Sequence, residues 1–209
     1  MFESVLSGSV ADDARTVASL PFMKEFYLAG GTGAALRLGH RVSRDLDLFS
    51  RGGIDPGRIR DTLREAGHFI VDQSDSRTLW GRFNDTKVSF FHYSCPLLRE
   101  TNPFMGMSVA SLVDIACMKL DAVSSRGKKR DFIDLFFILE VGEMDVPDLL
   151  GLYEKKYGVG NVNRVHLLKS MVYFDDAEND PEPRMLIPFS WNRLKDEFRR
   201  RVREFGSPG

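Results

Sequence analysis

The chain has 209 residues, of which 43% are hydrophobic, and its 16 phenylalanines are enough for a substantial core. This length indicates one domain, or one domain with a helical appendage. The 29 Lys and Arg residues nearly balance the 30 Asp and Glu residues. The resulting net charge of -1 excludes a global field that would draw the chain onto nucleic acid or a membrane, so any such attraction must come from local patches.

The two cysteines, Cys95 and Cys117, are far apart in the sequence and belong to no CxxC pair, as is typical of reduced thiols in a cytoplasmic protein. The N-terminus lacks the basic segment and the long apolar run of a signal peptide. No apolar stretch is long enough to span a bilayer. We therefore expect a cytoplasmic protein with no membrane partner.

The first half of the chain alternates helical and strand-like segments, separated by Pro and Gly residues. In chain order we expect a helix over 11–19, a buried strand over 25–29, a helix over 32–40, a strand over 45–50, a helix over 59–66, and strands over 69–72, 78–83 and 87–93. A hairpin turn at 84–86 joins the last two strands, and a loop follows over 96–103.

After Gly106 the sequence becomes predominantly helical. Helices are expected over 108–125, 128–141, 147–157, 162–174 and 189–205, with an acidic, proline-containing loop over 175–183. Strands interleaved with helices and followed by a helical block predict an α/β (α+β) sheet layer with a C-terminal bundle. We place the two parts at residues 1–105, an α/β core, and 106–209, a helical region packed on that core.

Two aspartates stand two positions apart in the predicted strand over 45–50. Because side chains alternate across a strand, Asp45 and Asp47 share one face, while Leu46 and Leu48 point into the core. Carboxylates held this close repel each other unless a divalent cation lies between them. Since one or two carboxylates with substrate phosphates commonly hold Mg²⁺, the pair predicts a site for Mg²⁺ (or Mn²⁺) bound with a nucleotide.

The glycine turn before this strand has the features of a phosphate cradle. Gly30 and Gly31 let the backbone approach a ligand, and Thr32 starts a helix whose free N–H groups favour phosphate. Alone, a Gly-Gly pair is usually a turn, and a DxD strand is usually an exposed edge. The conjunction of both within residues 30–47 is more specific and suits phosphoryl or nucleotidyl transfer.

The segment GGTGAALRLGHRVSRDLDLF at residues 30–49 resembles the signature of AbiEii/AbiGii-type toxin nucleotidyltransferases, which belong to the DNA-polymerase-β-like nucleotidyltransferase superfamily. Lys119 and the segment RDFIDL at 130–135 are similar to the family's later lysine and its RDxxDL helix. The resemblance covers roughly residues 26 to 139. It implies a mixed sheet with flanking helices, followed by a C-terminal helical bundle.

The resemblance also implies roles for individual residues. Asp45 and Asp47 would be the metal ligands, and Ser43 would orient the triphosphate or the metal shell. The residues that would line the nucleotide phosphates are Gly30, Gly31 and Thr32.

The later motif would act on the same nucleotide. Lys119 would neutralise the triphosphate, and Arg126 would replace the arginine that the family often places soon after this lysine. Asp131 would orient Lys119 or assist the acceptor hydroxyl. Lys119 lies in an apolar helical run and needs an anionic partner if it is buried, although a snorkelling lysine gives the same pattern. Asp131 is favoured by the helix dipole, which an ordinary N-terminal helix charge would also explain.

One position departs from the family pattern. Polymerase-β-like catalysts usually carry a third carboxylate on a neighbouring strand, and the matching strand here, over 87–93, has Ser89 in its place. A mechanism with a built-in base at this position is therefore in doubt. Asp131 could supply the function, the enzyme could work with fewer ligands, or activity could be lost.

The expected function is a nucleotidyltransferase that moves an NMP group from an NTP to a hydroxyl of RNA (such as tRNA) or of a protein. The family implies the toxin half of a toxin–antitoxin or phage-defence pair, with a cognate antitoxin as a partner. Ser89 keeps open a catalytically reduced nucleotide- or protein-binding module on the same fold. The near-neutral charge also permits a small-molecule acceptor.

Two basic runs could contact nucleic acid. One spans residues 126–130 beside Asp131, and the other spans 199–203 near the C-terminus. Such runs are usually solvated helix faces, so contact with nucleic acid depends mainly on the nearness of the first run to the predicted site.

Overall fold

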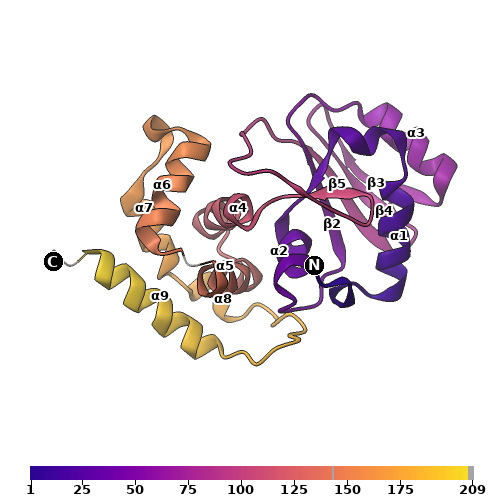
Figure 1. Cartoon of the computed structure of the whole chain (residues 1–209). Coiled ribbons are helices and arrows are strands. Elements are labelled where there is room, and N and C mark those ends of the chain that lie inside the picture. Colours follow the sequence, from indigo (N-terminus) through magenta and orange to yellow (C-terminus); the bar gives the residue numbers. More distant parts are fainter. Residues whose placement is uncertain (143, 207–209) are drawn as a thin grey trace.

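The computed structural model describes residues 1–142 and 144–206. Within these ranges, a mixed seven-stranded sheet occupies one side of the molecule and a group of helices the other (Figure 1). The strand order across the sheet is β3-β4-β5-β2-β1-β7-β6. The strands are β1 (Tyr27–Leu28), β2 (Asp45–Ser50), β3 (Phe69–Ser74), β4 (Thr78–Phe83), β5 (Thr86–His92), β6 (Asn102–Phe104) and β7 (Met107–Val109). The predicted mixed α/β class is confirmed.

The helices flank the sheet and then form the C-terminal group. They are α1 (Gly8–Ala18), α2 (Gly30–Leu38), α3 (Pro56–Ala66), α4 (Leu112–Ser125), α5 (Lys129–Val141), α6 (Val146–Tyr157), α7 (Arg164–Met171), α8 (Asp175–Glu178) and α9 (Trp191–Gly206). Figure 1 shows α1 and α3 beside the sheet, α6, α7 and α9 at the far end, and α4 and α5 between them. The predicted C-terminal helical bundle is therefore present.

The sheet and α2 separate two hydrophobic cores. On one face of the sheet, Leu46 and Leu48 of β2 pack in a core with Ile59 and Leu63 of α3. The second core lies among α4 to α9, and its centre includes the fully buried Phe132. The face of β2 that carries its aspartates therefore remains free of the first core, which leaves room for a polar site.

The structure differs from the sequence-based expectation around residue 105. The hairpin of β6 and β7 replaces the end of the expected loop and the start of the expected helix, so α4 begins at Leu112. Met105 and Gly106 form its turn with φ of 50° and 79°, as a two-residue hairpin requires. Three-residue strands carry too little alternation to be detected. Pro103 argues against a strand, but it is tolerated because β6 is at the sheet edge.

Four other expected elements have different bounds. The strand over 25–29 is reduced to β1, because Pro21–Glu25 form a 3-10 helix. Helix α2 begins at Gly30 instead of Thr32, and the helix over 162–174 is reduced to α7. The acidic loop contains the short helix α8. The remaining elements match their expected ranges to within a few residues.

The two parts of the chain are connected by more than the covalent link. The predicted division after residue 105 falls in the β6–β7 turn, and β7 pairs in parallel with β1 within the sheet. Farther along, the backbone of Val42 donates to the carbonyl of Arg184, and Leu186 donates to that of His40, at 2.9 Å each. The division into two parts stays a prediction.

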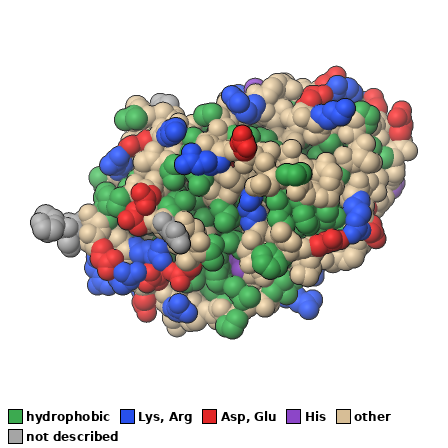
Figure 2. Space-filling model, viewed as in Figure 1, with side chains coloured by type: hydrophobic (Ala, Val, Ile, Leu, Met, Phe, Trp, Pro, Cys, Tyr) green, Lys and Arg blue, Asp and Glu red, His purple; other side chains and the backbone are tan. Residues whose placement is uncertain are grey.

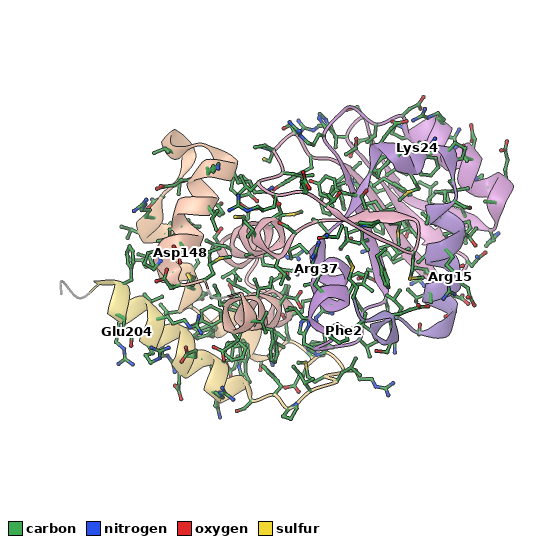
Figure 3. The ribbon with its side chains drawn as sticks, viewed as in Figure 1. Phe2, Arg15, Lys24, Arg37, Asp148 and Glu204 are labelled. Atoms are coloured by element: carbon green, nitrogen blue, oxygen red, sulfur yellow. The ribbon has the colours of Figure 1, made fainter. Side chains whose placement is uncertain are left out.

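Arg37 joins α2 to the β6–β7 hairpin. Its guanidinium donates to the carbonyls of Ala110 and Val109 and to the side chain of Asn102, so it fixes the end of α2 against the segment that leads into α4 (Figure 3). Cys95 and Cys117 are free thiols, as expected. Across residues 1–142 and 144–206, no helix combines the length and apolar character needed to cross a membrane.

Candidate active site

A row of aligned residues crosses the sheet. β2 and β5 run in parallel, with Asp45 beside Lys87 and Asp47 beside Ser89, and β4 continues the row with Trp80 beside Ser89. Residues directly opposite on neighbouring strands project from the same face. Both aspartates therefore lie on the face away from the core of Leu46 and Leu48, as predicted. Ser89 stands next to Asp47, in the position where a third carboxylate would be expected.

Gly30 lies against one of these aspartates. It has a φ of +62°, and a Cβ atom built on it would lie 2.8 Å from Asp47 Oδ2. No side chain caps the first turn of α2, whose N-cap residue is Ala29. Gly30 thus gives room to the Asp47 carboxylate beside an open helix N-terminus, where the dipole favours an anion.

Replacing Gly30 with Ala is expected to lower the free energy of unfolding by about 1–2 kcal/mol, because an L-residue is strained at this φ and its methyl group would displace Asp47. Thermal denaturation should show the loss, and calorimetry should show weaker binding of Mg²⁺ with NTP. Gly53→Ala is the control, since nothing lies within 4 Å of its Cβ position. Equal stability of Gly30→Ala and wild type would contradict the argument.

Thr32 and Ser43 connect α2 to the start of β2. The Thr32 hydroxyl lies 2.7 Å from that of Ser43 and also donates to the Asp45 carbonyl oxygen. Both side chains are buried at the edge of the site. Their hydroxyls hold the glycine turn and the aspartate strand together, so their contribution to the site includes this support.

Lys119 is buried and doubly paired. Its ammonium lies 2.9 Å from Asp131 Oδ1 and 2.7 Å from Asp134 Oδ2. Asp131 also accepts two hydrogen bonds from the Arg126 guanidinium, at 2.8 and 3.0 Å. Burial raises the pKa of Asp131, but the cations of Lys119 and Arg126 outweigh it and hold that pKa below its ordinary value. An ionised carboxylate with both oxygens bound suits the positioning of Lys119 better than proton transfer from an acceptor hydroxyl.

Asp134 is the centre of a buried ion cluster behind the site. Its carboxylate accepts two hydrogen bonds from the Arg41 guanidinium, at 2.6 and 2.8 Å, and one from His40 Nε2 at 2.8 Å, besides its ion pair with Lys119. Burial raises its pKa, yet Arg41 and Lys119 outweigh this effect, and the pKa lies well below its ordinary value. The cluster ties the loop before β2 to α4 and α5. Asp134, Arg41 and His40 lie within the motifs at 130–135 and 30–49, but no role in the site was predicted for them from the sequence.

The side chains converge on one polar cleft, whose volume is about 350 Å³. The predicted residues that line it are Gly31, Thr32, Ser43, Asp45, Asp47, Lys119 and Arg126. Asp131 lies behind Lys119 and Arg126. The cleft also contains Arg130, from the basic run at 126–130, and five residues that were not predicted from the sequence: Gln73, Thr78, Trp80, Lys87 and Phe91. Ser89 lines the cleft as well. For the residues on β4 and β5, the alternation of side chains along each predicted strand was the only sequence feature that indicated which face they occupy.

The two basic runs have different surroundings. In the first, Arg130 lines the cleft and lies 3.8 Å from Asp45 Oδ2, while Lys128 pairs with Asp180. In the second, Arg200 and Arg201 pair with Glu197, and mixed blue and red side chains cover the C-terminal helix in Figure 2. Only the first run therefore directs cationic charge to the cleft.

The electrostatics of the aspartate pair suit a divalent cation. Burial raises the pKa of Asp47 above its ordinary value, and the charge of Asp45 raises it further, against the opposing effects of Lys119 and Lys87. Within the part of the chain that the structure describes, no three His, Cys, Asp or Glu side chains group to hold a metal ion. A cation held by Asp45 and Asp47 would thus need further oxygen ligands, which nucleotide phosphates provide.

The fold is that of a polymerase-β-like nucleotidyltransferase. The chain superposes on MenT4, a nucleotidyltransferase toxin from Mycobacterium tuberculosis, with a TM-score of 0.57 and 16% identity, over 96% of this chain and 84% of that one. It also superposes on a Helicobacter pylori protein with a TM-score of 0.50 and 16% identity, over 96% and 98% of the two chains.

Comparison of the sequence with known families identifies one family within this fold class. Residues 15–207 match the family described as "Nucleotidyl transferase AbiEii toxin, Type IV TA system". An uncharacterised protein of Aquifex aeolicus is 36% identical over 197 residues, which cover 90% of this chain and 92% of that protein. The chain belongs to the AbiEii nucleotidyltransferase toxin family, as the motifs at residues 30–49 predicted.

Proposed function

We propose that this chain is an Mg²⁺-dependent nucleotidyltransferase that transfers an NMP group from an NTP to a hydroxyl of RNA or protein, as the toxin of a cytoplasmic toxin–antitoxin pair. The observation that carries the proposal is the convergence on one cleft of two strand aspartates, an uncapped helix N-terminus and the cationic side chains of α4 and α5. In the reaction, the acceptor oxygen bonds to the α-phosphorus, and the bond from that phosphorus to the β-phosphate bridging oxygen breaks to release pyrophosphate.

The cationic side chains are suited to the triphosphate. Lys119, Arg126 and Arg130 reach the cleft from α4, the end of α4 and the start of α5. Arg130 lies near Asp45, and it would be free to contact a phosphate if Asp45 held a cation instead. The pairing of Lys119 and Arg126 with Asp131 fixes both cations toward the nucleotide before it binds.

Asp45 and Asp47 would hold Mg²⁺, which when bound supplies Lewis-acid stabilisation of charge on the phosphates. Ser89, beside Asp47, can form a hydrogen bond with the acceptor hydroxyl. A serine hydroxyl is too weak a base at neutral pH to take the proton from that acceptor. The chain therefore offers no base at this position, and deprotonation of the hydroxyl falls to solvent.

The position of a radioactive label tests the transfer. Purified protein, Mg²⁺ and each NTP, labelled at either the α- or the γ-phosphate, are incubated with total RNA or with lysate protein. We expect the α-label to enter a macromolecule and the γ-label to leave as pyrophosphate. Transfer of the γ-label would identify a kinase instead, and no incorporation of either label from any NTP would contradict the proposal.

Ser89 favours one alternative, a nucleotide-binding module with reduced catalysis. Titration calorimetry of Mg²⁺ with each NTP separates the two. Binding without turnover would support the alternative, and binding with turnover would support the transferase. Co-expression with the product of an adjacent gene would identify a cognate antitoxin if it relieves growth inhibition that depends on Asp47.

A further inference from the structure

The cleft has a second side that the triphosphate does not need. Across the sheet, β1 and α2 lie on one side of β2, and β5, β4 and β3 lie on the other. The proposed function assigns the phosphates to the N-terminus of α2 and to the cations of α4 and α5. The acceptor must then approach over β5, β4 and β3. The cleft residues on those strands include Gln73, Thr78, Trp80 and Lys87.

Trp80 is held in place by a specific irregularity of the sheet. The register between β3 and β4 shifts between Val71 and Gln73, which is a β-bulge beside Trp80. After the bulge, Gln73 pairs with Trp80, and its Oε1 accepts a hydrogen bond of 3.1 Å from the indole Nε1. The backbone of β3 comes so close here that a Cβ on Gly81 would lie 2.0 Å from the Ile70 carbonyl oxygen. Bulges near active sites commonly re-aim a side chain, and here the result is a fixed, half-buried indole.

Two cations lie on the same face of the sheet as this ring, and only Lys87 has an acidic side chain, Asp45, opposite it on a neighbouring strand. Lys87 Nζ is 4.7 Å from the centre of the Trp80 ring, and Arg82 is directly opposite Lys87 in the β4–β5 register. Both side chains are exposed, and Lys87 is close enough to the aspartates to oppose the rise of the Asp47 pKa. Like charges placed opposite each other on neighbouring strands destabilise a sheet unless something neutralises them. Asp45 offsets part of this repulsion from its place opposite Lys87, whereas Arg82 has only Lys87 and Ile70 opposite it. An anionic ligand on this face would complete the neutralisation.

The register fixes how far the ring is from the reacting atoms. Trp80, Ser89 and Asp47 occupy one row on three consecutive strands. Two strand spacings amount to about 10 Å, so a nucleotide whose base stacks on Trp80 can direct its sugar hydroxyl toward Asp47. Aromatic rings with adjacent cations are the usual means of binding single-stranded nucleic acid without base-specific hydrogen bonds.

We propose that Trp80, Lys87 and Arg82 form the acceptor site for the end of a single-stranded RNA, with the terminal base on Trp80 and the phosphates on the two cations. This inference rests on the proposed function and narrows its acceptor to RNA. Trp80 is a binding and specificity residue here, while Gln73 positions it.

Tryptophan fluorescence tests the site without requiring turnover. Trp191 is replaced by Phe, so that Trp80 is the remaining tryptophan and can be excited selectively over the tyrosines. An unlabelled oligoadenylate RNA is then titrated into the full chain. We expect saturable quenching. RNA affinity is measured by filter retention. Trp80→Ala should lower this affinity roughly tenfold or more, whereas Trp80→Phe should keep most of the wild-type affinity. Lys87→Ala should reduce the slope of log affinity against log salt by about 0.7, which a merely structural lysine would not do.

Arg64→Ala is the matched control, since this exposed cation lies on α3, over the opposite face of the sheet. Thermal denaturation and calorimetric NTP binding are measured for every variant. Unchanged RNA affinity in Trp80→Ala, or equal quenching by blunt duplex RNA, would overturn the inference while leaving the proposed transferase intact. Loss of NTP binding by the wild-type chain would instead refute the proposed function.

Discussion

Asp47→Asn is expected to slow nucleotidyl transfer by two to four orders of magnitude, roughly, while making the protein without ligands more stable. The substitution keeps the shape of the side chain but removes a ligand charge, and the loss of several kcal/mol of transition-state stabilisation corresponds to roughly 10²- to 10⁴-fold in turnover. The wild-type carboxylate is also unfavourable in the empty cleft, because burial and Asp45 raise its pKa. The variant should therefore melt at a higher temperature in the absence of Mg²⁺.

The pH dependence gives the same prediction an independent check. Since the pKa of Asp47 is raised on folding, the native state retains a proton there that the unfolded chain has lost. Stability of the wild type should thus fall as pH rises from the ordinary pKa of an aspartate to the raised value, and Asp47→Asn should lack this decline. Asp85→Asn, in the exposed β4–β5 turn, should change neither property. An Asp47→Asn protein with full activity would exclude this residue as a metal ligand.

Asp134→Asn is expected to have the opposite effect on stability and to lower the free energy of unfolding by about 3–5 kcal/mol. Removing one partner of a buried ion pair leaves the others uncompensated, and here Arg41 and Lys119 would lose their shared carboxylate. Urea denaturation at neutral pH measures the loss. In the wild type, the stabilisation of the folded state by Asp134 should be fully present above the ordinary pKa of an aspartate. It should decrease as pH falls toward the depressed pKa of Asp134.

The control for Asp134→Asn is Asp196→Asn, because the side chain of Asp196 is 77% exposed and pairs with Arg199 on the same helix. An exposed pair of this kind contributes about 0–1 kcal/mol. A loss in Asp134→Asn no larger than that in Asp196→Asn would show that the buried cluster does not stabilise the fold.

The sequence predicted the local parts of the site because they depend on local patterns. The alternation of Asp45, Leu46, Asp47 and Leu48 determined both the strand and its polar face, and the structure has β2 over the same residues. The relation between Lys119 and Asp131 came from the family motif and from the need of a buried ammonium for an anion. Their ion pair shows that this need is met.

The missed residues depend on long-range pairing. Trp80 enters the cleft only because β4 aligns with β5 in a particular register, and Gln73 reaches Trp80 only through a bulge. Asp134 belongs to the same helical motif as Asp131, but its partners Arg41 and His40 lie more than ninety positions earlier. Hydrophobic periodicity carries no information on such contacts. The short strands β6 and β7 escaped detection for the related reason that their pairing, more than their composition, makes them strands.

The shared carboxylate of Asp134 also has an entropic consequence for substrate binding. A lysine side chain that becomes fixed loses up to about 2 kcal/mol of rotamer entropy, and an arginine loses a similar amount. Because Lys119 and Arg126 are already held by Asp131 and Asp134, they are ordered when the chain folds and not when the nucleotide arrives. Binding of the triphosphate therefore costs little further side-chain entropy at these two cations. A larger share of their electrostatic attraction to the phosphates then contributes to the binding free energy.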